Sequence, residues 1–111
     1  MTDACVVITT CGSEETALSI ASALVDQHLA ACVSIFPSVK SYYFFEGNTH
    51  LDEEISLMIK TRCELFDKVS ELITKLHTYD VPEIIMFKVD AVSESFLRWL
   101  SQTTKRGSPC D

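Results

Sequence analysis

Residues 30 to 61 constrain this fold more than any other stretch, because they have the pattern of one very long β-hairpin. The first arm, residues 32 to 45, is rich in β-branched and aromatic residues and ends in four consecutive aromatic side chains. Such a composition is typical of half-buried strands. Gly47 and Asn48 predict the turn, because both residue types accept positive φ. In the second arm, residues 54 to 60, the apolar residues Ile55, Leu57 and Ile59 share one face.

The predicted hairpin is too long for a domain of this size. A strand over residues 32 to 45 would span roughly 45 Å at about 3.3 Å per residue. A compact chain of 111 residues has a radius of gyration of about 13 Å and is therefore roughly 34 Å across. The aromatic tip must lie in solvent or pair with another subunit. We expect the second arrangement, an obligate oligomer.

The flanking segments predict a β-α-β-β-α-β order followed by one more helix. Residues 5 to 10 form a nearly continuous apolar run, typical of a central strand. Apolar residues at helical spacing predict helices over residues 14 to 29 and 65 to 76. Residues 83 to 89 predict the fourth strand, and Ser93 precedes the last short helix. This order predicts an α+β, ferredoxin-like fold with an antiparallel sheet and helices on one face.

Three local signals refine these boundaries. Ser13 is a natural N-cap for the first helix. Thr61 and Glu64 have the spacing of a capping box immediately before the second helix. Pro37 lies inside the first hairpin arm and cannot donate a ladder hydrogen bond, so it predicts a bulge or a bend.

Composition limits the classes of function. The length of 111 residues predicts a single domain that covers residues 1 to 111. The apolar fraction of 47% argues against disorder. The net charge of −7 argues against nucleic acid or an anionic membrane as a partner. The five cysteines form no C-x-x-C pair, which favours reduced thiols over a disulfide framework or a zinc site. With no signal-peptide pattern at the start, we expect a cytoplasmic protein.

Catalytic signatures are missing from the sequence. It contains no G-x-S-x-G, H-E-x-x-H or G-x-G-x-x-G pattern and has three glycines in all. The sequence therefore shows no recognisable motif that would bring together a nucleophile, a general base and hydrogen-bond donors for a developing negative charge. An acylphosphatase-like hydrolase on the same fold would need an Arg-bearing, glycine-rich loop at residues 9 to 13, which instead read TTCGS. We expect a protein that is not an enzyme.

Two groups of residues are candidate metal ligands. The acidic residues 52 to 54, with Glu46 across the turn, have the chemistry to ligate Mg²⁺ or Ca²⁺, or they form a solvated hairpin end that discourages aggregation. His77 and Glu83 flank a proline turn and suit Cu²⁺ or Zn²⁺. The alternative is that His77 interacts with the last carbonyls of its helix while Glu83 pairs with a basic residue.

Several separated stretches together resemble the CutA divalent-cation tolerance family. They are LAACVSIFP at residues 29 to 37, SYYFFEG at 41 to 47, DEEISLMIKT at 52 to 61 and LHTYDVPEI at 76 to 84. The resemblance covers about residues 5 to 101. It implies a ferredoxin-like homotrimer in which strands of neighbouring subunits join into continuous sheets. The family is similar in architecture to the nitrogen-regulatory PII proteins, which bind effectors in clefts between subunits. The resemblance also implies a link to tolerance of copper and other divalent metals, with no established catalytic activity.

The chain departs from the family at the proposed metal site. The copper site proposed for bacterial members of the family uses a cysteine in the first strand and a pair of histidines before the proline turn. Here Thr9 and Leu76 stand at two of these positions, which leaves His77, with Glu83 nearby. A hydroxyl and an isobutyl group do not replace a thiolate and an imidazole as Cu²⁺ ligands.

Two hypotheses follow from the residues and the resemblance. The first is a non-enzymatic homotrimer linked to divalent-metal tolerance, with no certain cofactor and with weak binding of copper or another divalent cation near His77 and Glu83. The second is a PII-like scaffold whose small effector lies in an intersubunit cleft lined by Lys60, Tyr79 and Trp99. Neither hypothesis identifies a further protein partner.

Overall fold

The computed structural model describes residues 2 to 105. Its elements are β1 (Ala4–Cys11), α1 (Glu14–Asp26), β2 (Cys32–Phe45), β3 (Asn48–Arg62), the 3₁₀ turn η1 (Cys63–Leu65), α2 (Phe66–Leu76), β4 (Ile85–Lys88) and α3 (Glu94–Thr103). The sheet order is β2-β3-β1-β4, and every neighbouring pair is antiparallel. The predicted α+β class and element order are confirmed. The fourth strand is shorter than the predicted residues 83 to 89.

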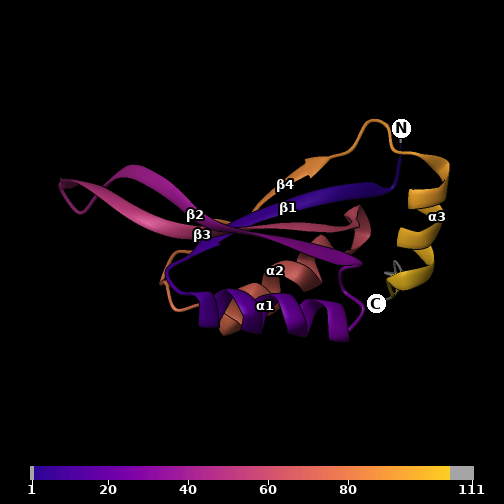
Figure 1. Cartoon of the computed structure of the whole chain (residues 1–111), viewed down its shortest axis with the longest axis horizontal. Coiled ribbons are helices and arrows are strands. Elements are labelled where there is room, and N and C mark those ends of the chain that lie inside the picture. The colour runs from indigo at the N-terminus through magenta and orange to yellow at the C-terminus, as the bar shows by residue number, and fades with distance from the viewer. Residues whose placement is uncertain (1, 106–111) are drawn as a thin grey trace.

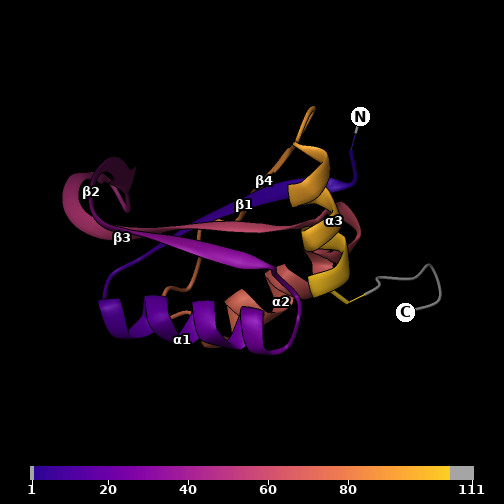
Figure 2. The ribbon, with the colours of Figure 1, turned by 45° about the vertical axis from the view of Figure 1, so that its right-hand side comes forward.

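Helices cover one face of the sheet only. In Figures 1 and 2, α1 and α2 lie together beneath the strands, while α3 lies at the end of the sheet opposite the hairpin tip. Along β1 every second side chain points to the helices, so Val7 and Thr9 are fully buried. Their partners in β3, Ile59 and Leu57, are fully buried as well. The core therefore lies between the sheet and α1 and α2.

The start of α1 confirms its predicted cap, whereas its end differs from the prediction. The Ser13 hydroxyl accepts a hydrogen bond from the Thr16 amide at 3.1 Å. The helix ends at Asp26, because His28 takes the left-handed conformation with φ of 59° and the Leu29 amide donates back to the Leu24 carbonyl at 2.9 Å. Such a residue commonly terminates a helix. The expected continuation to residue 29 is wrong by three residues.

The predicted capping box at Thr61 and Glu64 is also wrong. The β3 strand continues through Arg62, which pairs with Ala4, and η1 separates the strand from α2. Thr61 is fully buried, and its hydroxyl donates to the Leu29 carbonyl at 2.6 Å. Pairing of the strand therefore overrides the local helix-start signal.

The hairpin has the predicted bend and a different turn. The β2–β3 register shifts between Phe36 and Val39, which confirms a bulge around Pro37. The strands meet at Phe45 and Asn48, so the turn has two central residues, Glu46 and Gly47, with φ of 51° and 82°. Two-residue hairpin loops favour positive φ at both positions. The structure thus gives positive φ to Glu46, not to Asn48, and starts the second arm at residue 48, not 54.

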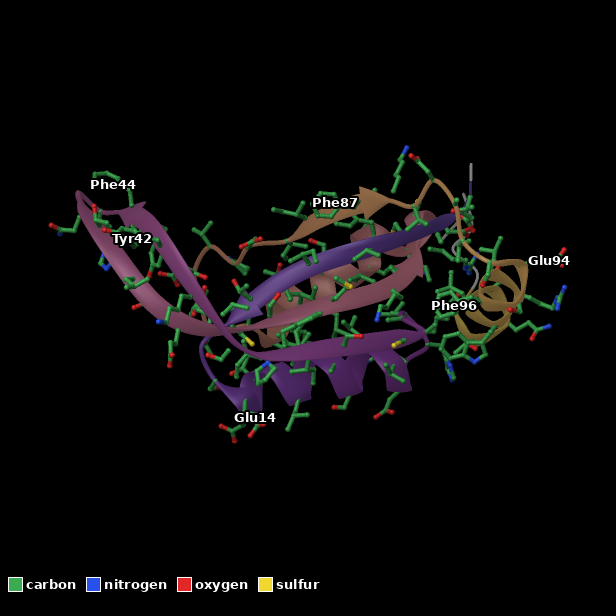
Figure 3. The ribbon with its side chains drawn as sticks, turned by 45° about the horizontal axis from the view of Figure 1, so that its top comes forward. Glu14, Tyr42, Phe44, Phe87, Glu94 and Phe96 are labelled. Carbon is green, nitrogen blue, oxygen red and sulfur yellow. The ribbon has the colours of Figure 1, made fainter. Side chains whose placement is uncertain are left out.

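The hairpin extends well beyond the rest of the molecule (Figure 1). The extents of the chain are 44 × 26 × 23 Å and its radius of gyration is 14.6 Å, larger than the roughly 13 Å of a compact chain of this length. Tyr42 and Phe44 on the projecting arm are 75% and 73% exposed, and Figure 3 shows both near the tip. The prediction that the hairpin outgrows its domain is confirmed.

The sheet face opposite α1 and α2 exposes several large apolar side chains. Phe87 and Ile85 of β4 are 57% and 45% exposed, and Phe36 of β2 is also exposed. Figure 3 shows Phe87 on β4, away from the helices. Exposed apolar area of this kind commonly marks an interaction surface.

Candidate functional site at the base of the hairpin

His77 ties the segment after α2 to the end of β1. It follows the last residue of α2 in extended conformation. Its Nε2 lies 2.7 Å from the Thr10 carbonyl oxygen, and its Nδ1 lies 3.1 Å from the Tyr79 amide nitrogen. A carbonyl only accepts and an amide only donates, so Nε2 carries the hydrogen and Nδ1 accepts. Both ring nitrogens are therefore used in holding this segment in place.

Tyr79 crosses from this segment to the hairpin. Its ring lies against His77 with a centroid distance of 4.6 Å, and its hydroxyl donates to Glu54 Oε2 at 2.7 Å. Burial and the hydrogen bond to this carboxylate raise the pKa of Tyr79 well above its ordinary value, so the phenol stays a donor. A Cβ added at Gly12 would lie 3.2 Å from the Tyr79 hydroxyl oxygen. Glycine at position 12 thus leaves the space that this phenol occupies.

The hairpin contributes a second tyrosine–carboxylate pair. The Tyr43 hydroxyl donates to Asp52, and this bond raises the pKa of Tyr43. Tyr43 also stacks on His50 with a centroid distance of 5.2 Å. Asp52 and Glu54 are two positions apart on β3 and therefore share a face of the strand. Glu54 is the more buried carboxylate, with only 9% of its surface exposed.

These side chains line a cavity of about 610 Å³ between the base of the hairpin and the segment after α2. Its acidic residues are Asp52, Glu54, Asp80 and Glu83. Its aromatic residues are Tyr42, Tyr43, Phe45 and Tyr79. None of the described residues lining it is a lysine or an arginine. The volume lies within the range of small-molecule sites, and the charge of the walls favours a cation.

The structure brings together only part of the residues that the sequence singled out. Tyr79 and Glu83 line the cavity. His77 is not among the lining residues, but its ring contacts the ring of Tyr79. Lys60 lies elsewhere, where its ammonium group donates to the Ser34 hydroxyl and to Cys32 Sγ, the latter at 3.7 Å. Trp99 packs on Phe96 of α3 with a centroid distance of 5.4 Å. Within one chain, Lys60 and Trp99 do not share the cavity with Tyr79.

Metal ligands are sparse in this region. Within residues 2 to 105, no group of three or more histidine, cysteine, aspartate or glutamate side chains is placed to hold a metal ion. Thr9 is fully buried on the helix side of the sheet, and Leu76 packs against the core. A metal ion at His77 would have to displace one of the two hydrogen bonds of its ring.

Sequence reasoning missed the role of Glu54. The sequence pattern places residues 52 to 54 together with Glu46 at one acidic end of the hairpin. In the structure Glu46 lies in the turn at the tip, whereas Glu54 pairs with Val39 at the base of the hairpin and meets Tyr79. Period-two alternation along β3 would have separated Asp52 and Glu54 from Glu53. The contact with Tyr79 has no signal in the sequence.

A family model described as "CutA1 divalent ion tolerance protein" matches residues 5 to 103. This chain belongs to the CutA family. A divalent-cation tolerance protein CutA from Thermus thermophilus is 41% identical over 99 residues, which are 89% of this chain and 96% of that protein. A CutA homologue from Danio rerio is 36% identical over 83% of this chain, which spans 61% of that relative.

Solved CutA structures show the same fold. The Thermus thermophilus divalent cation tolerance protein superposes with a TM-score of 0.89 at 40% identity, covering 92% of this chain and 99% of that one. A CutA structure from Xylella fastidiosa has a TM-score of 0.91 at 30% identity, with 94% and 100% covered. The CutA resemblance seen in the sequence is thereby confirmed. Within residues 2 to 105, no helix is both long and apolar enough to span a membrane.

Proposed function

We propose that this CutA chain acts as a homotrimer in divalent-metal tolerance in the cytoplasm, without catalysing a reaction. Membership of a family named for divalent-ion tolerance supports the link to metals. The observation that carries the assembly is the apolar surface that a single chain exposes on its hairpin and on the open face of its sheet.

The exposed rings are large enough to make association favourable. Tyr42, Phe44 and Phe87 each expose more than half of their surface. Burying such a ring contributes about 2–4 kcal/mol at about 25 cal/mol per Å². The sheet order also leaves the outer edges of β2 and β4 unpaired within one chain. A neighbour that pairs with the projecting hairpin would cover both the rings and an edge.

Light scattering at micromolar concentration tests this assembly. The expected mass is three times the 12.4 kDa of one chain. Phe87→Glu places a charge on the open face and should shift the mass towards the monomer. Leu18→Glu makes the same chemical change at an exposed position of α1, on the helix side, and should leave the trimer intact. A wild-type monomer would refute the proposal.

The metal proposal concerns His77 and Glu83, with copper or another divalent cation as the ligand. We expect weak binding, because each chain offers two ligands and both nitrogens of His77 are hydrogen-bonded. Further ligands would have to come from neighbouring subunits. Calorimetric titration with Cu²⁺ and Zn²⁺ tests this: His77→Ala and Glu83→Gln should each lose the heat, and His50→Ala at the hairpin should retain it. Equal, negligible heats in all four proteins would exclude the metal site.

The alternative function is a PII-like scaffold whose effector lies in an intersubunit cleft lined by Lys60, Tyr79 and Trp99. The cavity beside Tyr79 favours this alternative, because its volume of about 610 Å³ suits a small molecule. Saturable stabilisation by an organic effector in a thermal-shift screen would support it. Stabilisation by metal ions alone would support the first proposal.

A further inference from the structure

We propose that the thiols of Cys5 and Cys63 together bind one soft monovalent metal ion, Cu⁺ or Ag⁺, as a two-coordinate bis-thiolate. On binding, both S–H bonds break, two metal–sulfur bonds form, the two protons pass to solvent and no electron is transferred. The site uses neither His77 nor Glu83, and it does not rest on the divalent-metal proposal or on how the subunits associate.

The two thiols come from distant parts of the chain and meet where β1 begins and β3 ends, opposite the hairpin tip (Figure 1). Cys5 pairs with Thr61, and Cys63 follows the last residue of β3. The Cys63 amide donates to the Asp3 carbonyl at 2.8 Å, and Cys63 Sγ lies 3.6 Å from the Ala4 carbonyl oxygen. These contacts hold the Cys63 thiol beside Cys5, within reach of a hydrogen bond between the two side chains.

The pair lies in the core of a single chain. Cys5 is 1% exposed and belongs to the apolar cluster between the sheet and the helices. Cys63 is partly exposed and packs against the same cluster. Because residues of its own chain bury Cys5, no neighbouring subunit is needed to complete the surroundings of this sulfur. Cys63 gives an incoming ion a route from solvent to Cys5.

The separation of the two residues suits a bridging ion better than a disulfide. Cys63 lies two positions beyond Thr61 and is therefore diagonal to Cys5 across the strand pair. Diagonal Cα atoms of antiparallel strands are roughly 7–8 Å apart, whereas a disulfide needs about 4.4–6.8 Å. With metal–sulfur bonds of about 2.3 Å, an ion holds two sulfurs up to about 4.6 Å apart. The backbones of β1 and β3 can therefore keep their pairing when the ion binds.

The number of ligands selects the kind of ion. Structural zinc takes four ligands and calcium takes six or more. Within residues 2 to 105, no group of three or more histidine, cysteine, aspartate or glutamate side chains is placed to hold a metal ion. Cu⁺ and Ag⁺ are soft ions that prefer thiolates and form stable linear complexes with two of them. A pair of thiols in an apolar core therefore favours a soft monovalent ion over a divalent one.

Anaerobic titration of the full-length protein with Cu⁺, in competition with the coloured chelator bicinchoninate, measures the binding. Every protein carries Cys110→Ser, because that cysteine lies outside the described residues. This parent protein should bind one Cu⁺ per chain. Cys5→Ala and Cys63→Ser should each weaken binding at least about 100-fold, since even the loss of an outer-shell partner costs about 10–100-fold.

The remaining cysteines provide matched controls. Cys11→Ala changes the other buried thiol of β1, and Cys32→Ser changes the other partly exposed thiol. Both controls should keep the Cu⁺ affinity of the parent protein, and so should His77→Ala. X-ray absorption of the loaded parent protein should show two sulfur ligands on copper.

The proposal is wrong if the parent protein binds no Cu⁺ or if Cys63→Ser binds it with unchanged affinity. Cys63 is partly exposed, so this variant decides the question even if Cys5→Ala fails to fold. Equal weakening by Cys11→Ala or Cys32→Ser would indicate unspecific thiol binding, and a third sulfur on copper would contradict the two-coordinate site. Loss of both thiols in air without copper would show that the pair forms a disulfide instead. The wild-type mass and the divalent-ion titration of His77→Ala test the proposed function separately.

Discussion

Two buried threonines on the same face of the sheet provide a sharp test of the core. Thr9 of β1 and Thr61 of β3 are both fully buried and both point towards the helices. The Thr61 hydroxyl donates to the Leu29 carbonyl at 2.6 Å, whereas the Thr9 hydroxyl has no hydrogen-bond partner among the described residues. Valine has nearly the same shape as threonine without the hydroxyl. The same substitution should therefore have opposite effects at the two sites.

The expected magnitudes follow from the hydrogen bonds. A buried hydroxyl without a partner costs about 1–3 kcal/mol, so Thr9→Val should raise the free energy of unfolding by about 1–2 kcal/mol. Thr61→Val removes a donor and leaves the Leu29 carbonyl unpaired, so it should lower the free energy of unfolding by about 1–3 kcal/mol.

Urea unfolding followed by circular dichroism measures both changes. All variants need the same subunit concentration, because the stability of an oligomer depends on it. The midpoint should rise for Thr9→Val and fall for Thr61→Val, with an unchanged slope. If Thr9→Val lowers the midpoint as much as Thr61→Val, the Thr9 hydroxyl is hydrogen-bonded in solution. The prediction that its removal stabilises the protein would then be wrong.

Two further predictions concern the site and the thiols. Gly12→Ala should displace the Tyr79 hydroxyl, because the new Cβ would lie 3.2 Å from it. Gly12→Ala and Tyr79→Phe should each lower the free energy of unfolding by about 1–2 kcal/mol, and in a double-mutant cycle the two losses should be less than additive. Full additivity would show that Gly12 acts independently of Tyr79. Burial raises the pKa of Cys5 from 9.0 to about 12, so the unfolded chain loses this proton first and stability should fall as pH rises from 9 towards 12. Cys5→Ala should flatten that decline in pH-dependent urea unfolding, and an unaltered slope would contradict the assignment.

The sequence predicted features that depend on neighbouring residues. Ser13 caps α1 and the bulge at Pro37 forms, because each requires only local geometry. The first arm of the hairpin, residues 32 to 45, also forms as predicted, whereas the second arm starts six residues earlier than predicted. Thr61 shows the limit of this approach: its capping pattern is real, but pairing with β1 and burial against Leu29 determine its conformation.

The site was less predictable, because its contacts join distant segments. The sequence indicates His77 and Glu83 by residue type alone, whereas in the structure His77 holds the segment after α2 in place through Thr10 and Tyr79. Glu54 meets Tyr79 across 25 positions of sequence, which no periodicity of a single strand indicates. Only the path of the chain after α2 brings these groups together.

The bulge at Pro37 links the cavity to the assembly. The hairpin residues that line the cavity all lie on the tip side of the register shift; they are Ser41, Tyr42, Tyr43, Phe45, Asp52 and Glu54. The bend therefore sets both the wall of the cavity and the direction in which the aromatic tip projects. Because Tyr79 bonds to Glu54 at the base of this hairpin, a ligand that changes the contact would also act on the arm proposed to hold the subunits together. Ligand binding and subunit association should consequently be coupled, each strengthening the other when the ligand favours the bent hairpin.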